Sequence, residues 1–249
     1  MAPRLLSVIG LDARLPPGRP DASAGAGMEK HVDRSKGLSG EAYDKFKKGL
    51  LSRRIAPGST MTQSELADVL SVSVSPLRNA LKVLESEGFV TILPRSGIQI
   101  GKPDLDLVRN SYQLRQIIEE PALIRFAEHC APADLERIKQ VHLEVLERAK
   151  GAVGDNCALF DEASEIDMGF HKQVVGALEN PIIDTIYNTN HERILLIRLD
   201  RHKASTAYVR TTFEEHLTII DPLIDGDVQR AVAALRVHLD KALKRAMGL

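Results

Sequence analysis

Four residues in the C-terminal half of the chain have side chains of the types that can coordinate a divalent metal ion. The stretch EIDMGFHKQV places Asp167 and His171 four residues apart, and His216 and His238 follow with a spacing of 22. Side chains four residues apart share one face of a helix, so Asp167 and His171 would lie together beside apolar neighbours. His216 and His238 fall on apolar stripes of their own helical segments. The sequence therefore predicts one carboxylate and three imidazoles that point into a protein core.

Buried polar groups of this kind need a common partner. A single core histidine usually bonds to a backbone carbonyl, but several unpaired polar groups would each cost about 1 to 3 kcal/mol. A shared divalent metal removes that cost. Three imidazoles and one carboxylate suit Zn²⁺, Ni²⁺, Mn²⁺ or Fe²⁺, and the absence of thiolates disfavours a closed structural zinc site. Four protein ligands leave an octahedral metal with two open positions, enough for a chelating small molecule.

The composition describes a globular protein without membrane segments. The chain has 249 residues, of which 43% are hydrophobic and 27% charged, and this length accommodates two domains. Its apolar runs fall far short of the roughly 20 residues that a spanning helix needs. Cys130 and Cys157 have no CxxC spacing. Two such cysteines fit a reducing compartment, so we expect a cytoplasmic protein.

Positive charge is concentrated toward the N-terminus, although the net charge is −1. Residues 29–102 hold 12 Lys and Arg against 8 Asp and Glu, whereas residues 103–249 hold 18 against 24. A polyanionic partner is therefore expected to bind before residue 103. The segment of residues 1–38 is rich in Pro, Gly, Ala and Ser over most of its length, and this composition predicts a mobile N-terminal tail.

Residues 39–102 have the pattern of a winged helix-turn-helix domain. The amphipathic segment AYDKFKKGLLSRR is followed by TQSELADVL, in which Thr62 and Glu65 have capping-box spacing. A third helix follows SVSVSP, with Pro76 in its first turn. The alternating segments FVTIL and GIQIG flank PRSG and predict a small β-hairpin.

The third helix of this domain is expected to enter the major groove of DNA. Ser73, Ser75 and Arg78 lie at its leading end, and a guanidinium such as that of Arg78 can bond guanine or clamp a phosphate. Arg95 at the hairpin tip could reach the minor groove or the backbone, and Gly97 permits the tight turn. The alternative for both arginines is an ordinary solvated charge.

This segment resembles the GntR family of bacterial transcription regulators throughout its length of about 60 residues. The resemblance implies operator binding. One position departs from the pattern, because the family usually has Arg directly after the residue that corresponds to Ser73, and this chain has Val74. We therefore expect an operator that differs from the family's common sites, or an affinity that depends more on phosphate contacts.

The second domain, residues 103–249, is expected to be an antiparallel six-helix bundle. Proline and glycine positions divide it into helices at about 104–128, 132–150, 157–178, 181–202, 205–224 and 226–247. The chain as a whole is thus predicted to be mostly α-helical, with the hairpin as its small β element.

Arg115-x-x-x-Glu119, Asp167-x-x-x-His171, His216 and His238 together resemble the FCD ligand-binding domain of the FadR subfamily, in its shorter VanR-type branch. The resemblance implies metal ligands at the last four positions and an effector, commonly a small carboxylic acid, bound next to the metal. Arg115 is the candidate contact for that carboxylate, and its alternative role is an ion pair with Glu119. The other histidines are expected to face solvent: His31, His129, His142, His191 and His202.

These features predict a homodimeric transcription regulator that reads operator DNA and senses a metabolite at a metal. We expect a repressor that releases DNA when the effector binds, and the same parts could also serve an activator. The alternative is a metal-dependent enzyme that uses the same three histidines and aspartate to activate water, with Glu119 as its general base. A further alternative is that the metal itself is the signal.

Overall fold

The computed structural model describes residues 37–152, 156–201 and 205–249. These residues form two compact units, and the division between them falls after Asp104. All but the last two residues of the predicted mobile tail lie outside the described residues, as do His31 and His202.

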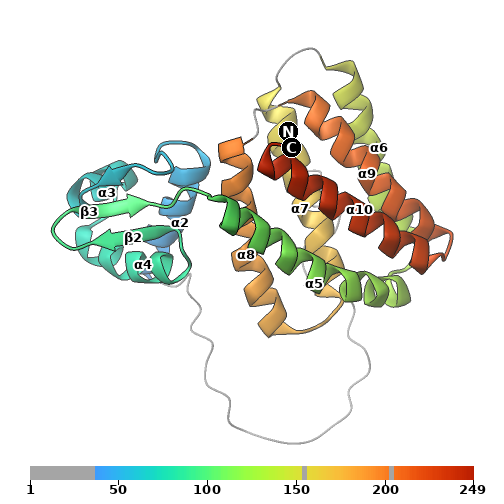
Figure 1. Ribbon diagram of the computed structural model, residues 1–249, viewed down its shortest axis with the longest axis horizontal. Helices are drawn as coiled ribbons and strands as arrows, with labels where there is room; N and C mark the ends of the chain where they lie inside the picture. Colours follow the sequence, from blue (N-terminus) through green and yellow to red (C-terminus); the bar gives the residue numbers. More distant parts are fainter. Residues whose placement is uncertain (1–36, 153–155, 202–204) are drawn as a thin grey trace, which may run out of the picture. The chain divides into compact units, whose positions relative to one another are not determined.

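In its described residues, the N-terminal unit combines three helices with a small sheet (Figure 1). Its elements are α2 (Leu38–Leu51), β1 (Thr60–Met61), α3 (Gln63–Leu70), α4 (Val74–Ser86), β2 (Val90–Leu93) and β3 (Gly97–Ile100). The predicted hairpin is present as β2 and β3, paired antiparallel with Ile92 opposite Ile98. The sheet has a third strand that the sequence did not reveal, since β1 pairs with the other side of β3. Two residues are too few to show an alternating pattern.

Local signals in the sequence account for this arrangement. Thr62 and Glu65 form the predicted capping box: Glu65 N donates to Thr62 Oγ1 at 3.2 Å, and Thr62 N donates to Glu65 Oε2 at 2.8 Å. Phe46, Leu66 and Leu81 are fully buried between the three helices. The core of the unit therefore fixes α4 so that its opposite face remains exposed.

The C-terminal unit consists of helices throughout its described residues. They are α5 (Leu105–His129), α6 (Pro132–Gly151), α7 (Cys157–Gly176), α8 (Pro181–Arg201), α9 (Thr206–Ile224) and α10 (Val228–Met247). Each predicted helix is present, with ends within two residues of those predicted. None of the described helices combines the length and the apolar character needed to cross a membrane.

Helix α7 lies at the centre of this unit and contacts α5, α6, α8 and α9. Its side chains contribute to three apolar clusters, through Phe170 in one, Ile166 in another and Met168 in the third. Asp167 and His171 lie among these residues on the same helix. Their burial follows from the helix position, because almost every side of α7 faces another helix.

Candidate metal centre

The structure brings the four predicted metal ligands together in the interior of the C-terminal unit. Asp167 and His171 come from α7, His216 from α9 and His238 from α10, and their exposed fractions are 0 to 2%. Each side chain offers one ligand atom, and these atoms lie within 4.8 Å of one another. Three helices that are distant in sequence thus contribute to one compact polar centre.

The atoms that face this centre have no hydrogen-bond partner. They are Asp167 Oδ1 and the Nε2 atoms of His171, His216 and His238. Asp167 Oδ1 lies 3.1 Å from His216 Nε2 and 3.6 Å from His171 Nε2. Ligands at roughly 2.0 to 2.2 Å from one cation lie about 3 Å or slightly more apart. The donor set and its unpartnered atoms therefore fit a divalent metal ion.

The second ring nitrogen of each histidine faces a different acceptor. His238 Nδ1 lies 2.9 Å from Glu215 Oε2, and His216 Nδ1 lies 3.1 Å from His142 Nε2. His171 Nδ1 lies 2.8 Å from Glu119 Oε2, although this contact does not have the geometry of a hydrogen bond. A proton held on Nδ1 leaves the lone pair on Nε2, which is the arrangement that a metal requires.

Each buried carboxylate of the centre has its own arginine. Arg115 Nε donates to Glu119 Oε1 at 2.6 Å, and Arg245 holds Glu215 with two bonds of 2.8 and 2.9 Å. Arg198 pairs with Asp167 Oδ2. The three carboxylates and three guanidinium groups cancel in charge. A cation bound among them would add uncompensated positive charge to the interior.

These surroundings set the protonation states. Burial alone would raise the pKa of each carboxyl, but the adjacent Arg198 holds the pKa of Asp167 well below its usual value. Hydrogen bonds from His238 and Arg245 likewise outweigh burial and lower the pKa of Glu215 to about 2. Burial lowers the pKa of His238 to about 3. An anionic carboxylate and a neutral imidazole at neutral pH are the forms that bind metals.

Arg115 is 3% exposed and makes the ion pair with Glu119 that was its alternative role. Tyr187 also donates to Glu119 Oε1, at 2.7 Å. One terminal nitrogen of Arg115, Nη1, has no partner. The guanidinium thus keeps one donor nitrogen beyond the ion pair.

The prediction that His142 faces solvent was wrong. Its side chain is 1% exposed on α6 and reaches His216. Position 142 lies four residues after Ile138 and three before Val145, and both of these residues are buried. The helical period of α6 therefore indicates that His142 is buried as well. His129 is exposed as expected, whereas His191 on α8 is partly buried.

Sequence reasoning also missed the groups that support the ligands. They are Tyr187, Arg198, Glu215 and Arg245. Arg198 is 31 residues from its partner Asp167, and Arg245 is 30 residues from Glu215. Neither distance corresponds to a helical repeat, so no spacing in the sequence indicates these pairs.

The residues predicted to contact DNA lie at the surface of the N-terminal unit. Ser73, Ser75, Arg78 and Arg95 are all exposed. Ser73 precedes the first turn of α4 and its side chain does not cap the helix. Gly97 has a φ of 107°, and a Cβ at this position would lie 2.6 Å from Met61 O. Glycine therefore permits both the turn and the close approach of β1.

A winged helix-turn-helix unit followed by a helical unit with a buried polar centre is an arrangement typical of transcription regulators that sense a ligand. The sequence matches two families: the bacterial regulatory proteins of the gntR family over residues 38–100, and the FCD domain over residues 110–241. The chain belongs to the GntR family of transcription regulators and carries an FCD domain. Proteins of this kind regulate transcription and are not enzymes.

Curated relatives and solved structures agree with this assignment. The Nta operon transcriptional regulator of Aminobacter aminovorans is 26% identical over 191 residues, which cover 77% of this chain and 86% of the relative. The transcriptional repressor RspR of Escherichia coli is 23% identical over 220 residues, covering 86% and 91%. E. coli McbR/YncC has a TM-score of 0.67 at 16% identity, covering 85% and 98%. A GntR regulator from Rhodococcus sp. RHA1 also has a TM-score of 0.67, at 17% identity, covering 84% and 97%. These two structures share the fold.

Proposed function

We propose that this protein is a cytoplasmic repressor that binds operator DNA as a homodimer and releases it when a small carboxylic acid binds at a divalent metal. Asp167, His171, His216 and His238 hold the metal, which is Zn²⁺, Ni²⁺, Mn²⁺ or Fe²⁺. The observation that carries this proposal is the convergence of their four unpartnered atoms. When bound, the metal supplies positive charge and free coordination positions for the acid.

The charge balance of the centre supports an anionic effector. Its carboxylates are already neutralised by arginines, as the pairs of Asp167 with Arg198 and Glu215 with Arg245 illustrate. A divalent ion therefore leaves an excess of two positive charges in a buried region, where unpaired charge is costly. A carboxylate or dicarboxylate would offset this excess.

Arg115 is suited to a second contact with the same ligand. Its Nε and Nη2 atoms face Glu119, but Nη1 has no partner. An arginine has five N–H donors, so it can keep one carboxylate while it binds another. We propose that Arg115 donates to the effector without leaving Glu119.

We propose that the effector changes the structure when it binds. The cavity beside Asp167, Arg198 and Thr212 has a volume of about 10 Å³, which holds at most about one water molecule. A metabolite that approaches Asp167 from this side requires the surrounding helices to move apart. Binding would then favour an open arrangement over the closed one, and such differential binding is the condition for control of DNA affinity.

DNA recognition is assigned to the exposed start of α4 and to the hairpin tip. Ser73, Ser75 and Arg78 would contact the major groove, while Arg95 and the turn at Gly97 would follow the backbone or the minor groove. Val74 offers no hydrogen bond to a base, so phosphate contacts carry more of the affinity. The VanR-type assignment within the family stays a prediction.

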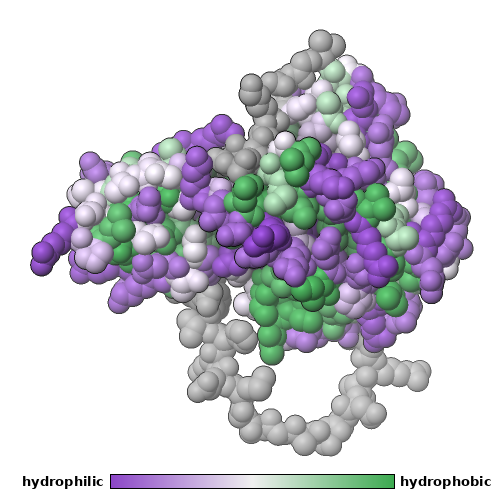
Figure 2. All heavy atoms as spheres, viewed as in Figure 1, coloured by the Kyte–Doolittle hydropathy of each residue, from purple (hydrophilic) through white to green (hydrophobic). Residues whose placement is uncertain are grey.

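A second copy is needed because one short recognition helix reads only a half-site. The C-terminal unit has an exposed apolar region suited to such a contact. Ile117 on α5 and Ile182 and Ile186 on α8 are 63, 68 and 47% exposed. The two helices are in contact, and Figure 2 shows hydrophobic surface gathered over them. Apolar surface of this kind commonly marks a protein interface.

The test is an operator titration in several arms. Full-length protein is used to select DNA from a random pool, and fluorescence polarisation then gives its affinity with Zn²⁺, with chelator, and with Zn²⁺ plus acetate, succinate or citrate. Effector control requires a loss of affinity that one of these acids produces only with metal present. If chelator alone changes the affinity and the acids do not, the metal is the signal. Identical DNA affinity under all of these conditions would contradict both control by an acid and control by the metal.

A further inference from the structure

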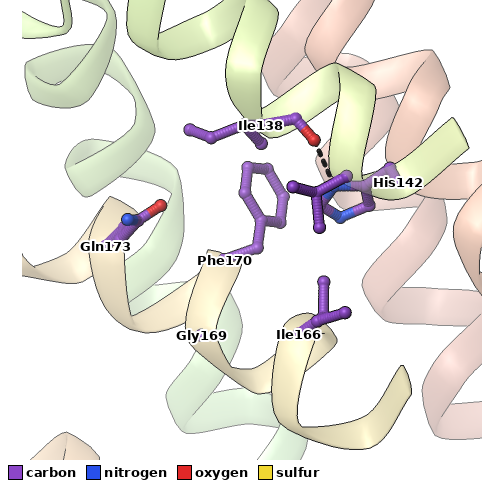
Figure 3. Close-up of a pocket in the computed structure, with 7 residues that line it drawn as sticks. Ile138, His142, Ile166, Gly169, Phe170 and Gln173 are labelled. Atoms are coloured by element: carbon purple, nitrogen blue, oxygen red, sulfur yellow. Dashed lines mark hydrogen bonds between the residues drawn. The ribbon is translucent and has the colours of Figure 1, made fainter. Parts of the chain in front are cut away.

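His142 contacts the metal centre from α6, a helix that provides none of the proposed ligands. Its Nε2 lies 3.1 Å from His216 Nδ1, and its Nδ1 lies 2.8 Å from the backbone oxygen of Ile138. Figure 3 shows the bond to Ile138 and the ring of Phe170 beside it. The imidazole is thus held at both nitrogens.

The direction of hydrogen bonding along this chain is fixed by chemistry. The Ile138 oxygen can only accept, so Nδ1 of His142 must carry the proton. In a neutral imidazole the other nitrogen then has a lone pair, and Nε2 of His142 accepts from Nδ1 of His216. His216 consequently presents a bare Nε2 to the centre, where that atom has no other partner.

We propose that His142 is a positioning residue that fixes the tautomer and ring orientation of His216 for metal binding. This inference rests on the proposed metal site and adds a residue that is not a ligand. His142 takes the place of the carboxylates that face the other two rings, Glu119 for His171 and Glu215 for His238.

The surroundings explain why an imidazole serves at this position. The His142 ring packs against Phe213 and Phe170, with centroid distances of 5.0 and 5.5 Å. Glu119 and Glu215 are each neutralised by an arginine, and Arg198 is already paired with Asp167. A fourth carboxylate, placed between two phenylalanines, would be a buried charge with no such partner. A neutral acceptor orients His216 without that cost.

The cavity beside His142 guides the choice of substitution. Its volume is about 10 Å³, and Ile138, Ile166, Phe170 and Gln173 contribute to its lining. Removing the imidazole altogether would enlarge it enough for water, which could accept from His216 in place of His142. His142→Leu fills the space without an acceptor. His142→Gln can place an amide oxygen near the position of Nε2.

The experiment measures metal affinity and ligand geometry in the full-length protein. Metal is removed with chelator, Zn²⁺ affinity is determined by competition with a chromogenic chelator, and the Co²⁺ form is recorded by visible absorption. We expect His142→Leu to weaken Zn²⁺ binding by about 10- to 100-fold and to alter the Co²⁺ spectrum. His142→Gln should recover most of the affinity and the wild-type spectrum. Gln173→Ala, which alters the same cavity without touching His216, should match the wild type.

Each outcome decides a separate point. Wild-type affinity and spectrum in folded His142→Leu would overturn the role of His142 while leaving the metal site intact. If His142→Leu and His142→Gln bind Zn²⁺ equally weakly, His142 contributes through packing and not as a hydrogen-bond acceptor for His216. If His142→Leu fails to fold, His142→Met against His142→Gln gives the same comparison. A wild-type protein that binds neither Zn²⁺ nor Co²⁺ would remove the metal site and this inference with it.

Discussion

Arg198 and Asp167 form a buried ion pair that engages Oδ2 and leaves Oδ1 of the same carboxylate beside the three imidazoles. The pair has two consequences. It compensates the charge of Asp167 when no metal is present, and it reserves one oxygen for a monodentate bond. A buried carboxylate with a permanent counter-charge can therefore serve as a ligand without leaving an uncompensated charge in the metal-free protein.

Arg198→Met tests this dual role. Removing one partner of a buried ion pair costs about 3 to 5 kcal/mol, because the other charge stays buried and uncompensated. A bound cation would restore part of the compensation at Asp167. We expect the free energy of unfolding, measured with urea, to fall by that amount with chelator and by clearly less with saturating Zn²⁺.

Arg109→Met is the matched control, since Arg109 pairs with Asp106 at the surface and both side chains are more than 60% exposed. Exposed pairs contribute about 0 to 1 kcal/mol, so Zn²⁺ should not alter its effect. Equal losses for Arg198→Met with and without Zn²⁺ would show that Asp167 does not share its charge with a metal.

A substitution in one unit of the chain should impair the function of that unit and leave the function of the other unchanged. His238→Ala removes one proposed ligand and should weaken metal affinity by roughly tenfold or more, which lowers the metal content measured by mass spectrometry of the purified protein. Arg78→Ala should leave metal content unchanged and weaken specific DNA binding by about 1 to 3 kcal/mol if the guanidinium bonds a base. Fluorescence polarisation on selected and random DNA separates specific from nonspecific affinity. A common defect in both variants would contradict the proposed division between DNA binding and sensing.

Much of the fold could be predicted because its signals are local. Pro132 and Pro181 begin the helices where they were expected, and Thr62 with Glu65 begins α3. Strand β1 escaped prediction because its pairing with β3 depends on tertiary contact. Nearby residues such as prolines and capping side chains therefore determine where a helix begins. Which strand a short strand pairs with depends on the tertiary fold.

The candidate site divides in the same way. Asp167 with His171 and Arg115 with Glu119 could be found because each pair spans one helical turn. The ion pair of Glu215 with Arg245 joins two helices, and no periodicity relates residues on different helices. His142 was missed for another reason. Its spacing from apolar residues indicated a buried position on α6, but the prediction followed the residue type, because histidine is often found at the surface.

Stability of the metal-free protein should fall as the pH is lowered from 7. Burial lowers the pKa values of His142 and His238 to about 3, so below about 6.5 the unfolded chain binds protons that the folded chain does not. The unfolded state is then favoured, and each histidine removes about 2 kcal/mol between pH 7 and 5. Glu215, with its lowered pKa, adds to the loss only below about 4.5. Urea unfolding in chelator at pH 7, 6 and 5 measures the slope, and a flat profile would mean that these rings are accessible to protons in the folded state.

The wing of the N-terminal unit depends on a glycine at its turn. Gly97 has a φ of 107°, and an added Cβ would lie 2.6 Å from Met61 O. Strain of this kind costs on the order of 1 to 3 kcal/mol, and a clash with backbone cannot be relieved by rotating a side chain. Gly97→Ala should therefore weaken DNA binding and lower the stability of this unit without changing metal content.

Gly176→Ala on α7 is the control, because its Cβ would meet nothing within 4 Å, and alanine there should be neutral or stabilising by about 0.5 to 1 kcal/mol. Calorimetry together with DNA titration compares the two variants, and equal behaviour would show that β1 and β3 can separate at no cost to the DNA-binding surface.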